Sequence, residues 1–309
     1  MSISFTAFKD KSANFFDWMA GVLARSPIWL QNVAFGLLRV VMKALYFVPT
    51  GHVRQVAVNF SKQIEDRSPR ELYFCLIDGL VRMIRALEVL SRHGAVDSLP
   101  EFTMSEQVKQ MLDERVGKGA ILAMPHSTGS LLAVHALARD YDILMLIREP
   151  LSEERARTQR RFFENLGCEI LDVRRTEASK VARTLFKALR SGRFVVGTVD
   201  RIRSAPPHRK RVHRETDTIY TKVFGSEVGA TGWPARFAHK CQLPILPLMP
   251  LNTINAVKLE VGAPVIATGD LIVDTQAWLD ALILLFKQYP DHWMFAYDRR
   301  WAKALKKAS

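Results

Sequence analysis

The sequence predicts an α/β protein with a mixed, largely parallel sheet flanked by helices, preceded by an N-terminal helical region that associates with a membrane. From residue 118 onward, short apolar runs alternate with helical patterns, which is typical of βαβ units. Before that point lies a long apolar segment, 28–48, whose polar residues form one stripe. The 309 residues are 48% hydrophobic and 24% charged, a composition that excludes a disordered or collagen-like chain.

The chain is strongly basic, with 44 Lys and Arg against 31 Asp and Glu and a net charge of +13. This excess indicates an anionic partner: nucleic acid, an anionic membrane surface or an acidic substrate. No nucleic acid is expected, because the sequence has no helix-turn-helix, RNP or zinc signature. The three cysteines are far apart, so neither a disulfide framework nor a metal site is expected.

Segment 28–48 is long enough to span a bilayer, but it is not uniformly apolar. Asn32, Gly36, Arg39 and Lys43 fall on one stripe of a helix. Two cations at mid-helix disfavour simple spanning by about 2.5–3.5 kcal/mol each. The pattern therefore favours an amphipathic helix in the membrane interface, or a tilted one whose cations reach the headgroups. The alternative is a core-packed helix of a soluble protein.

The following stretch, 52–93, is predicted to be helical throughout, because its leucines recur at spacings of three and four. Residues 1–117 therefore form an N-terminal helical region, and residues 118–309 form the α/β core. No linker separates the two, so the change at residue 118 is interpreted as a subdomain border. The start of the chain has no continuous apolar region, and a cleaved signal peptide is not expected.

The elements of the core follow from short apolar runs. The predicted strands are 120–124, 142–147, 168–173, 193–200, 242–251 and 257–266. Ser152 and Thr176 are predicted to cap the helices that follow the second and third strands, and a final helix is expected at about 275–288. Residues 201–214 carry six Lys and Arg and are predicted to be a flexible basic loop, which either grips phosphates or is simply solvated.

Two residues at strand ends are candidates for chemistry. His126 follows the first core strand at the turn into a helix, and Asp200 ends the strand 193–200. Because ligands of open α/β sheets bind beyond the carboxyl ends of the strands, both side chains are expected in one crevice. A neutral imidazole there can take a proton from a hydroxyl nucleophile. The alternatives are a helix-capping histidine and a turn aspartate. Ser127 and Ser130 are interpreted as cap and turn residues, because G-x-S-x-G is absent.

A glycine-containing block from 223 ends in Ala230 and Thr231, which are predicted to open a helix. The free amides of such a helix start favour an anion or an oxyanion. The block does not match G-x-G-x-x-G, so dinucleotide binding is not indicated.

The order of these parts resembles the bacterial lipid A late acyltransferases. These are the lauroyl and myristoyl transferases, a branch of the lysophospholipid acyltransferase superfamily. The matching parts are the His after a strand, the Arg-containing helix after LIREP, and the segments LRSGRFVVGTVD, VFG…ATG…LPILP and YPDHWMFAYDRRW. The resemblance covers about residues 20 to 303 and depends on the ordered set rather than on any single part.

The resemblance implies an enzyme that moves a fatty acyl chain from acyl carrier protein or acyl coenzyme A to a hydroxyl or amine of a lipid acceptor. The implied acceptor is a lipid A precursor or a related glycolipid. The implied place is the cytoplasmic face of the bacterial inner membrane, as a peripheral protein or with a single N-terminal anchor. Beyond the acyl donor no cofactor is implied. The basic surface would suit anionic membrane lipid, phosphorylated acceptor and acidic carrier protein alike.

The resemblance also assigns residues. It makes His126 the general base and matches Asp200 to an aspartate at the strand end. The candidate substrate-binding residues in the matching parts are Arg148, Glu149, Arg160, Arg161, Phe224, Gly225 and Thr231. Among them, Arg161, and next Arg160, is implied to hold a phosphate.

The sequence departs from the family's His-x4-Asp/Glu pair, because Leu131 stands where the acid is expected. In that pair the carboxylate orients the imidazole and stabilises its protonated form. Three interpretations remain open. A carboxylate from elsewhere, first Asp200 or Glu149, replaces the acid; the histidine acts alone at lower efficiency; or the chain is a non-catalytic protein that binds or assembles lipids on the same scaffold.

Overall fold

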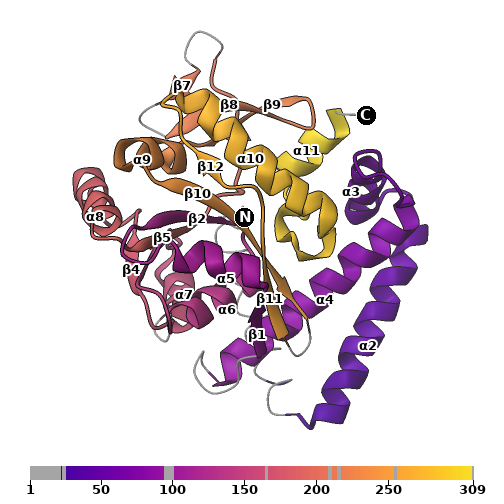
Figure 1. The fold of residues 1–309 in the computed structure, drawn as a ribbon. Coiled ribbons are helices and arrows are strands. Elements are labelled where there is room, and N and C mark those ends of the chain that lie inside the picture. Colours follow the sequence, from indigo (N-terminus) through magenta and orange to yellow (C-terminus); the bar gives the residue numbers. More distant parts are fainter. Residues whose placement is uncertain are drawn as a thin grey trace, which may run out of the picture.

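A computed structural model describes Val22 and residues 26–93, 101–163, 166–207, 211–213, 217–253 and 256–307. Within these residues one eight-stranded sheet runs through the centre of the protein (Figure 1). Its strands are β1 (Glu101–Met104), β2 (Ala120–Met124), β3 (Ile143–Ile147), β4 (Glu169–Asp172), β5 (Phe194–Thr198), β10 (Pro244–Asn252), β11 (Ala256–Val261) and β12 (Val265–Ile266). The strand order is β1-β11-β10-β2-β5-β3-β4, and β12 pairs with β10.

The sheet is mixed and largely parallel. Strands β10, β2, β5, β3 and β4 pair in parallel, whereas β11 and β12 run antiparallel to β10. Every residue of β2 and β3 is buried, as expected for strands covered on both faces. The predicted fold class is therefore confirmed. Strand β1 was not predicted; it lies before residue 118 and pairs with β11.

Helices cover both faces of the sheet. They are α5 (Glu106–Asp113), α6 (Thr128–Leu137), α7 (Glu153–Phe163), α8 (Ala178–Arg190), α9 (Trp233–Cys241), α10 (Leu271–Gln288) and α11 (Arg299–Lys307). One buried apolar cluster joins α5, α6 and α7 to the sheet, and a second joins α8, α9, α10 and α11. Two short 3-10 helices, η3 (Pro290–His292) and η4 (Met294–Tyr297), connect α10 to α11.

Two predicted helix starts were wrong. Helix α10 begins at Leu271 rather than near 275, because the Asp270 carboxylate accepts hydrogen bonds from the amides of Ile272 and Val273, at 2.9 and 3.1 Å. Helix α8 is preceded by Glu177 rather than Thr176 at its cap position. Helix α11, which follows α10, was not predicted as a helix.

The N-terminal helices are α2 (Ile28–Ala44), α3 (His52–Ser61) and α4 (Pro69–His93), with a 3-10 turn, η1 (Leu45–Phe47), after α2. The prediction of one continuous helix over 52–93 was wrong. Residue Asp66 has φ +70°, and a capping box starts the new helix at Ser68. The Ser68 hydroxyl accepts from the Glu71 amide at 3.2 Å, and the Glu71 carboxylate accepts from the Ser68 amide at 2.9 Å.

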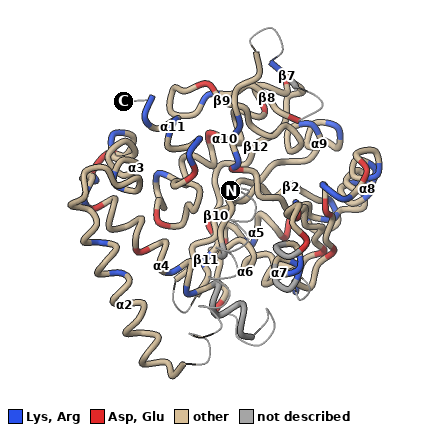
Figure 2. Tube along the Cα trace, turned by 180° about the vertical axis from the view of Figure 1, so that it is seen from behind, with Lys and Arg blue, Asp and Glu red and all other residues tan. Residues whose placement is uncertain are grey.

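Helix α2 lies along α4 (Figure 1), and its apolar face is turned outward. Arg39 and Lys43 turn toward α4, where both pair with Asp78 at 2.5 and 2.9 Å; they are the two blue bands on α2 in Figure 2. On the outward side, exposed fractions of 40–65% are found for Leu30, Val33, Leu37, Val40 and Val41. Among the described residues, Ile28–Phe47 is the one helix long and apolar enough to cross or anchor in a membrane.

A second, four-stranded antiparallel sheet corrects two predictions. Its strands are β6 (Arg203–Ser204), β7 (Val212–His213), β8 (Thr218–Val223) and β9 (Ser226–Thr231), in the order β6-β9-β8-β7. The basic segment 201–214 is thus partly strand, with 208–210 and 214 outside the described residues. Ala230 and Thr231 end a strand rather than open a helix.

Candidate active site

The paired strands β2 and β5 bring His126 and Asp200 together. In their register Met124 lies opposite Thr198, and each candidate follows two residues later. The Asp200 Oδ1 atom accepts a hydrogen bond from the His126 amide at 2.9 Å and lies 2.5 Å from His126 Nδ1. The Asp200 side chain is fully buried, whereas 34% of the His126 side chain is exposed. A buried carboxylate therefore holds a histidine whose ring reaches solvent.

This contact fixes the hydrogen on the imidazole. The carboxylate oxygen Oδ1 is the acceptor of this contact, so Nδ1 is the nitrogen of His126 that donates, and Nε2 faces Thr198. The Thr198 Oγ1 atom lies 3.0 Å from Nε2. The sequence analysis missed Thr198, although it stands two residues before Asp200 at the end of the same strand. The three side chains form a hydroxyl–imidazole–carboxylate line.

The segment 290–307 covers this line. The Phe295 ring stacks on the His126 imidazole with ring centres 4.5 Å apart and planes 18° from parallel. The indole Nε1 of Trp301 donates a hydrogen bond of 2.7 Å to the backbone carbonyl of Asp200. Both contacts restrict the orientation of the imidazole, because the ring is packed on one face and the strand end behind it is held by a hydrogen bond.

The serines beside His126 have structural roles, which confirms their interpretation as cap and turn residues. Ser127 caps α6 by accepting from the Ser130 amide at 3.0 Å. The Ser130 hydroxyl donates to the Pro125 carbonyl at 2.7 Å. Leu131, in the position where the family has its acid, is half-buried and packs against the apolar cluster beneath α6.

Glu149, the other candidate acid, lies in a different group of charges. Its carboxylate pairs with Arg160 and Arg175, each at 2.8 Å, and both arginines also pair with Glu153. The hydrogen bond from Arg160 keeps the pKa of Glu149 below its usual range. Glu149 and Glu153 both pair with Arg160, and Arg175 also lies 3.7 Å from Asp172, so the charge of Arg160 is already balanced. The structure thus places Asp200, and not Glu149, against His126.

The remaining candidates are spread over the neighbouring elements. Arg148 follows β3 and is exposed; Arg161 lies in α7, and its side chain is outside the described residues. Phe224 and Gly225 form the two-residue turn between β8 and β9, with φ +48° and +74°. The Phe224 ring packs against Phe60 and Trp301 rather than against the histidine.

Thr231 lies at the start of α9, where the expected anion site is already filled. The Thr231 hydroxyl donates to Asp217 Oδ2 at 3.0 Å. The same oxygen accepts from the amides of Gly232 and Trp233 at 3.1 and 2.8 Å. The protein's own carboxylate therefore caps this helix, which corrects the expectation of an external anion or oxyanion there.

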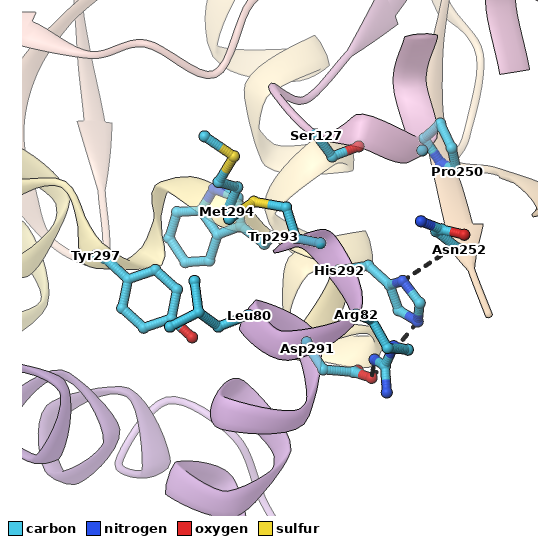
Figure 3. A pocket seen from close by; sticks show the side chains of 13 residues that line it. Leu80, Arg82, Ser127, Pro250, Asn252, Asp291, His292, Trp293, Met294 and Tyr297 are labelled. Carbon is cyan, nitrogen blue, oxygen red and sulfur yellow. Dashed lines mark hydrogen bonds and ion pairs between the residues drawn. The ribbon is translucent and has the colours of Figure 1, made fainter. Parts of the chain in front are cut away.

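A small cavity opens beside the start of α6 (Figure 3). Its volume is about 30 Å³, room for roughly two waters. The lining residues come from α4, from α6, from the end of β10 and from 291–297, and those drawn and labelled in Figure 3 are Leu80, Arg82, Ser127, Pro250, Asn252, Asp291, His292, Trp293, Met294 and Tyr297. Ser127 directly follows His126, so the cavity borders the site.

One wall of the cavity contains a neutral histidine. His292 Nδ1 accepts a hydrogen bond of 3.1 Å from the Asn252 amide. Burial lowers the pKa of His292 to about 4, and the nearby Asp291 carboxylate only partly opposes this shift. An ion pair joins Asp291 to Arg82 in α4, so this wall ties α4 to the segment that covers His126.

Among the described residues, no group of three or more His, Cys, Asp or Glu side chains is placed to hold a metal ion. No protein-family model matches the chain. No curated protein is significantly similar to it in sequence.

Proposed function

We propose that the protein is an acyltransferase in which His126 is the general base and Asp200 is the acid that orients it. The observation that carries the proposal is the 2.5 Å contact between His126 Nδ1 and the fully buried Asp200 carboxylate. A base held by a carboxylate on one nitrogen, with the other nitrogen open to a hydroxyl, is the arrangement that acyl transfer needs. In this proposal Asp200 takes the role of the acid that the resemblance places at position 131, where this chain has leucine.

The reaction follows from these positions. The acceptor hydroxyl or amine gives its proton to Nε2 of His126 and attacks the thioester carbonyl of the donor. The tetrahedral intermediate then releases the donor thiol, which takes the proton back from the imidazolium. Asp200 stabilises the imidazolium between these two transfers. The amides of Thr128 and Gly129 directly follow the base and precede the Ser130 amide that Ser127 caps, so they are the candidate donors to the oxyanion.

The place of the reaction is a membrane surface. The outward face of α2 is apolar, its two cations are paired with Asp78, and Trp29 and Phe47 are exposed near its ends. Such a helix lies in the bilayer interface or anchors in it. In line with the family resemblance, we place the protein on the cytoplasmic face of a bacterial inner membrane. Acyl carrier protein or acyl coenzyme A is then the donor, and a lipid A precursor or a related glycolipid is the acceptor.

The test is acyl transfer by the full-length protein in vesicles of bacterial polar lipids, with radiolabelled acyl carrier protein and acyl coenzyme A offered separately. We expect transfer with one donor and a loss of at least a thousandfold in His126→Ala. The matched control is His239→Ala, because His239 is an exposed histidine on α9. Folded wild type without transfer from either donor would contradict the proposal and favour the non-catalytic lipid-binding alternative.

The position of Thr198 favours a second candidate, a two-step transfer. Here the Thr198 hydroxyl, 3.0 Å from Nε2, attacks the thioester, its proton passes through His126 to the leaving thiol, and an acyl-threonine ester forms. The acceptor then attacks this ester. Donor alone would add the mass of the acyl group to wild type and not to Thr198→Val, whereas direct transfer leaves both masses unchanged.

A further inference from the structure

Helix α8 carries a row of four cations on its outward face. Lys180, Arg183, Lys187 and Arg190 are all exposed, and Figure 2 shows blue bands along α8. On a helical wheel these positions fall within about 80° of one another, and they extend over about 15 Å of the helix axis. The 13 residues of α8 include no Asp or Glu. The helix therefore presents one positively charged row, which we call the α8 stripe.

The charge of the α8 stripe is not balanced within the described residues. No carboxylate among them pairs with any of the four cations. Like charges three or four positions apart repel on a helix surface, so the row weakens α8 by itself. The opposite face of the helix lies in the core, where Leu185, Ala188 and Leu189 are buried. Packing thus holds the stripe in place, and its charge is available to a partner.

An aromatic side chain lies among the cations at the carboxyl end of the stripe. Phe186 is half-buried and packs against Phe237 of α9, with ring centres 4.9 Å apart. Two cations lie over the Phe186 ring, Arg190 at 5.7 Å and Lys240 of α9 at 5.6 Å from its centre. These contacts extend the positive surface to α9 and add an apolar patch to it. Aromatic rings and arginines are enriched at the centres of protein–protein interfaces.

The α8 stripe faces away from the side of the protein that we assign to the membrane. Helices α8 and α2 lie at opposite sides of the molecule in both views (Figures 1 and 2). A bilayer that contacts the apolar face of α2 therefore does not reach α8. A two-fold contact with a second copy of the chain would bring cations against cations. A soluble protein with an acidic surface fits this position.

Helix α8 also connects this surface to the proposed active site. It packs on β5, the strand that leads to Asp200, and it follows the short connection 173–177 from the carboxyl end of β4. Because β2, β3, β4 and β5 are parallel, the amino-terminal end of α8 lies toward the edge of the sheet where Asp200 meets His126. A protein docked on the stripe therefore has the proposed site at the Lys180 end of the helix.

We propose that the α8 stripe docks acyl carrier protein, which makes the carrier protein, rather than acyl coenzyme A, the donor of the proposed acyl transfer. The identity of the partner rests on the proposed function. An acidic helix of the carrier protein can match the row of cations, and such complementary charges speed association and fix the orientation of the docked protein. Coenzyme A brings no protein surface to match the stripe.

The binding test uses the full-length protein in micelles of a neutral detergent and fluorescently labelled acyl carrier protein without an acyl group, followed by fluorescence anisotropy. The site variant, Arg183→Gln/Lys187→Gln, removes two charges from the middle of the stripe. The control variant, Lys109→Gln/Arg139→Gln, removes the same charge from two exposed residues, one in α5 and one just after α6. Helices α5 and α6 pack in the other apolar cluster, away from α8.

We expect wild type and the control variant to bind the carrier protein alike, and the site variant to bind it at least tenfold more weakly and with a smaller salt dependence. A second site variant, Lys180→Gln/Lys240→Gln, should show the same loss. No binding by wild type, or equal losses in the site and control variants, would overturn the proposal.

Two further probes identify other occupants of this surface. A site variant that loses coenzyme A as strongly as carrier protein would show a phosphate site instead of a docking surface. A labelled single-stranded oligonucleotide that binds wild type more tightly than the carrier protein, and binds the site variant tenfold more weakly, would assign the stripe to nucleic acid. Either result would overturn the proposal.

Transfer kinetics separate this proposal from the proposed function. The site variant should raise KM for acylated carrier protein about tenfold and leave kcat unchanged, because docking contributes equally before and during the chemical step. His126→Ala should bind the carrier protein as wild type does. Binding without transfer would refute the catalytic proposal and leave the docking surface intact, whereas transfer from acyl coenzyme A without carrier binding would refute the docking surface alone.

Discussion

The side chains of His126 and Asp200, 74 positions apart in the chain, meet at 2.5 Å because β2 and β5 are adjacent parallel strands. The contact makes Nδ1 the nitrogen that donates to the carboxylate, and Nε2 lies 3.0 Å from the Thr198 hydroxyl. Under the proposed function, Asp200 takes the role of the acid that the family resemblance places five residues after the histidine.

The first prediction distinguishes Asp200 from Glu149, the two carboxylates that the sequence analysis named as possible replacements for the missing acid. Asp200→Asn keeps the size of the side chain but removes the charge that stabilises the imidazolium, so kcat should fall by about 10³ to 10⁴. Glu149→Gln, which disrupts only the group around Arg160, should have at least a hundredfold smaller effect. Initial transfer rates in vesicles check this, with circular dichroism to confirm folding. Similar losses in the two variants would contradict the assignment.

The second prediction concerns the close contact of α4 with η3. A Cβ atom on Gly79 would lie 1.9 Å from the backbone oxygen of Asp291, so Gly79→Ala should lower the free energy of unfolding by about 1–3 kcal/mol. Gly36 in α2 is the control, because a Cβ there meets nothing within 4 Å. Gly36→Ala should raise stability by about 0.5–1 kcal/mol. Urea denaturation in detergent gives both values, and a stabilising Gly79→Ala would refute the contact.

The third prediction is a pH dependence of stability that originates at His292. The pKa of this group falls from 6.5 to about 4 on folding. Between these pH values the unfolded chain binds a proton that the folded protein does not, so stability is full above pH 6.5 and declines toward pH 4. The decline is on the order of 3 kcal/mol. His292→Asn should remove this part of the slope in urea midpoints taken at pH 7.5, 6 and 5. Parallel curves for the two proteins would exclude His292 as the cause.

The fourth prediction tests the outward face of α2. Leu37→Glu/Val40→Glu places two charges on that face and should release the protein from vesicles of phosphatidylglycerol and phosphatidylethanolamine in a sedimentation assay. Val116→Glu/Val273→Glu adds the same charge at two other exposed apolar residues, with exposed fractions of 56% and 53%, and should still sediment. Release of both variants would point to net charge instead of the apolar face.

The sequence was sufficient for the fold class, because the strand runs 120–124, 142–147 and 193–200 have apolar centres and are bounded by helix signals. The position of His126 and Asp200 at strand ends followed from the same pattern. The choice between Asp200 and Glu149 could not be made, because it depends on the order of strands in the sheet. Strand β5 lies next to β2, whereas β3 lies one strand further away.

The sequence analysis missed features that are formed by contacts between residues distant in the sequence. The alternation in 218–223 indicates a strand, but the glycines after it were interpreted as a helix start, and the hairpin was missed. Thr198 was missed because nothing local marks its hydroxyl as a partner of His126.

Phe295 and Trp301 enclose the His126–Asp200 pair, and their late position in the chain has a consequence for folding during translation. The Asp200 carbonyl receives its hydrogen bond from Trp301, 101 residues later in the chain, and Phe295 is made shortly before Trp301. A nascent polypeptide can therefore pair His126 with Asp200 on the ribosome well before the aromatic wall exists. His126 and Asp200 are thus both synthesised before the two aromatic residues that enclose them.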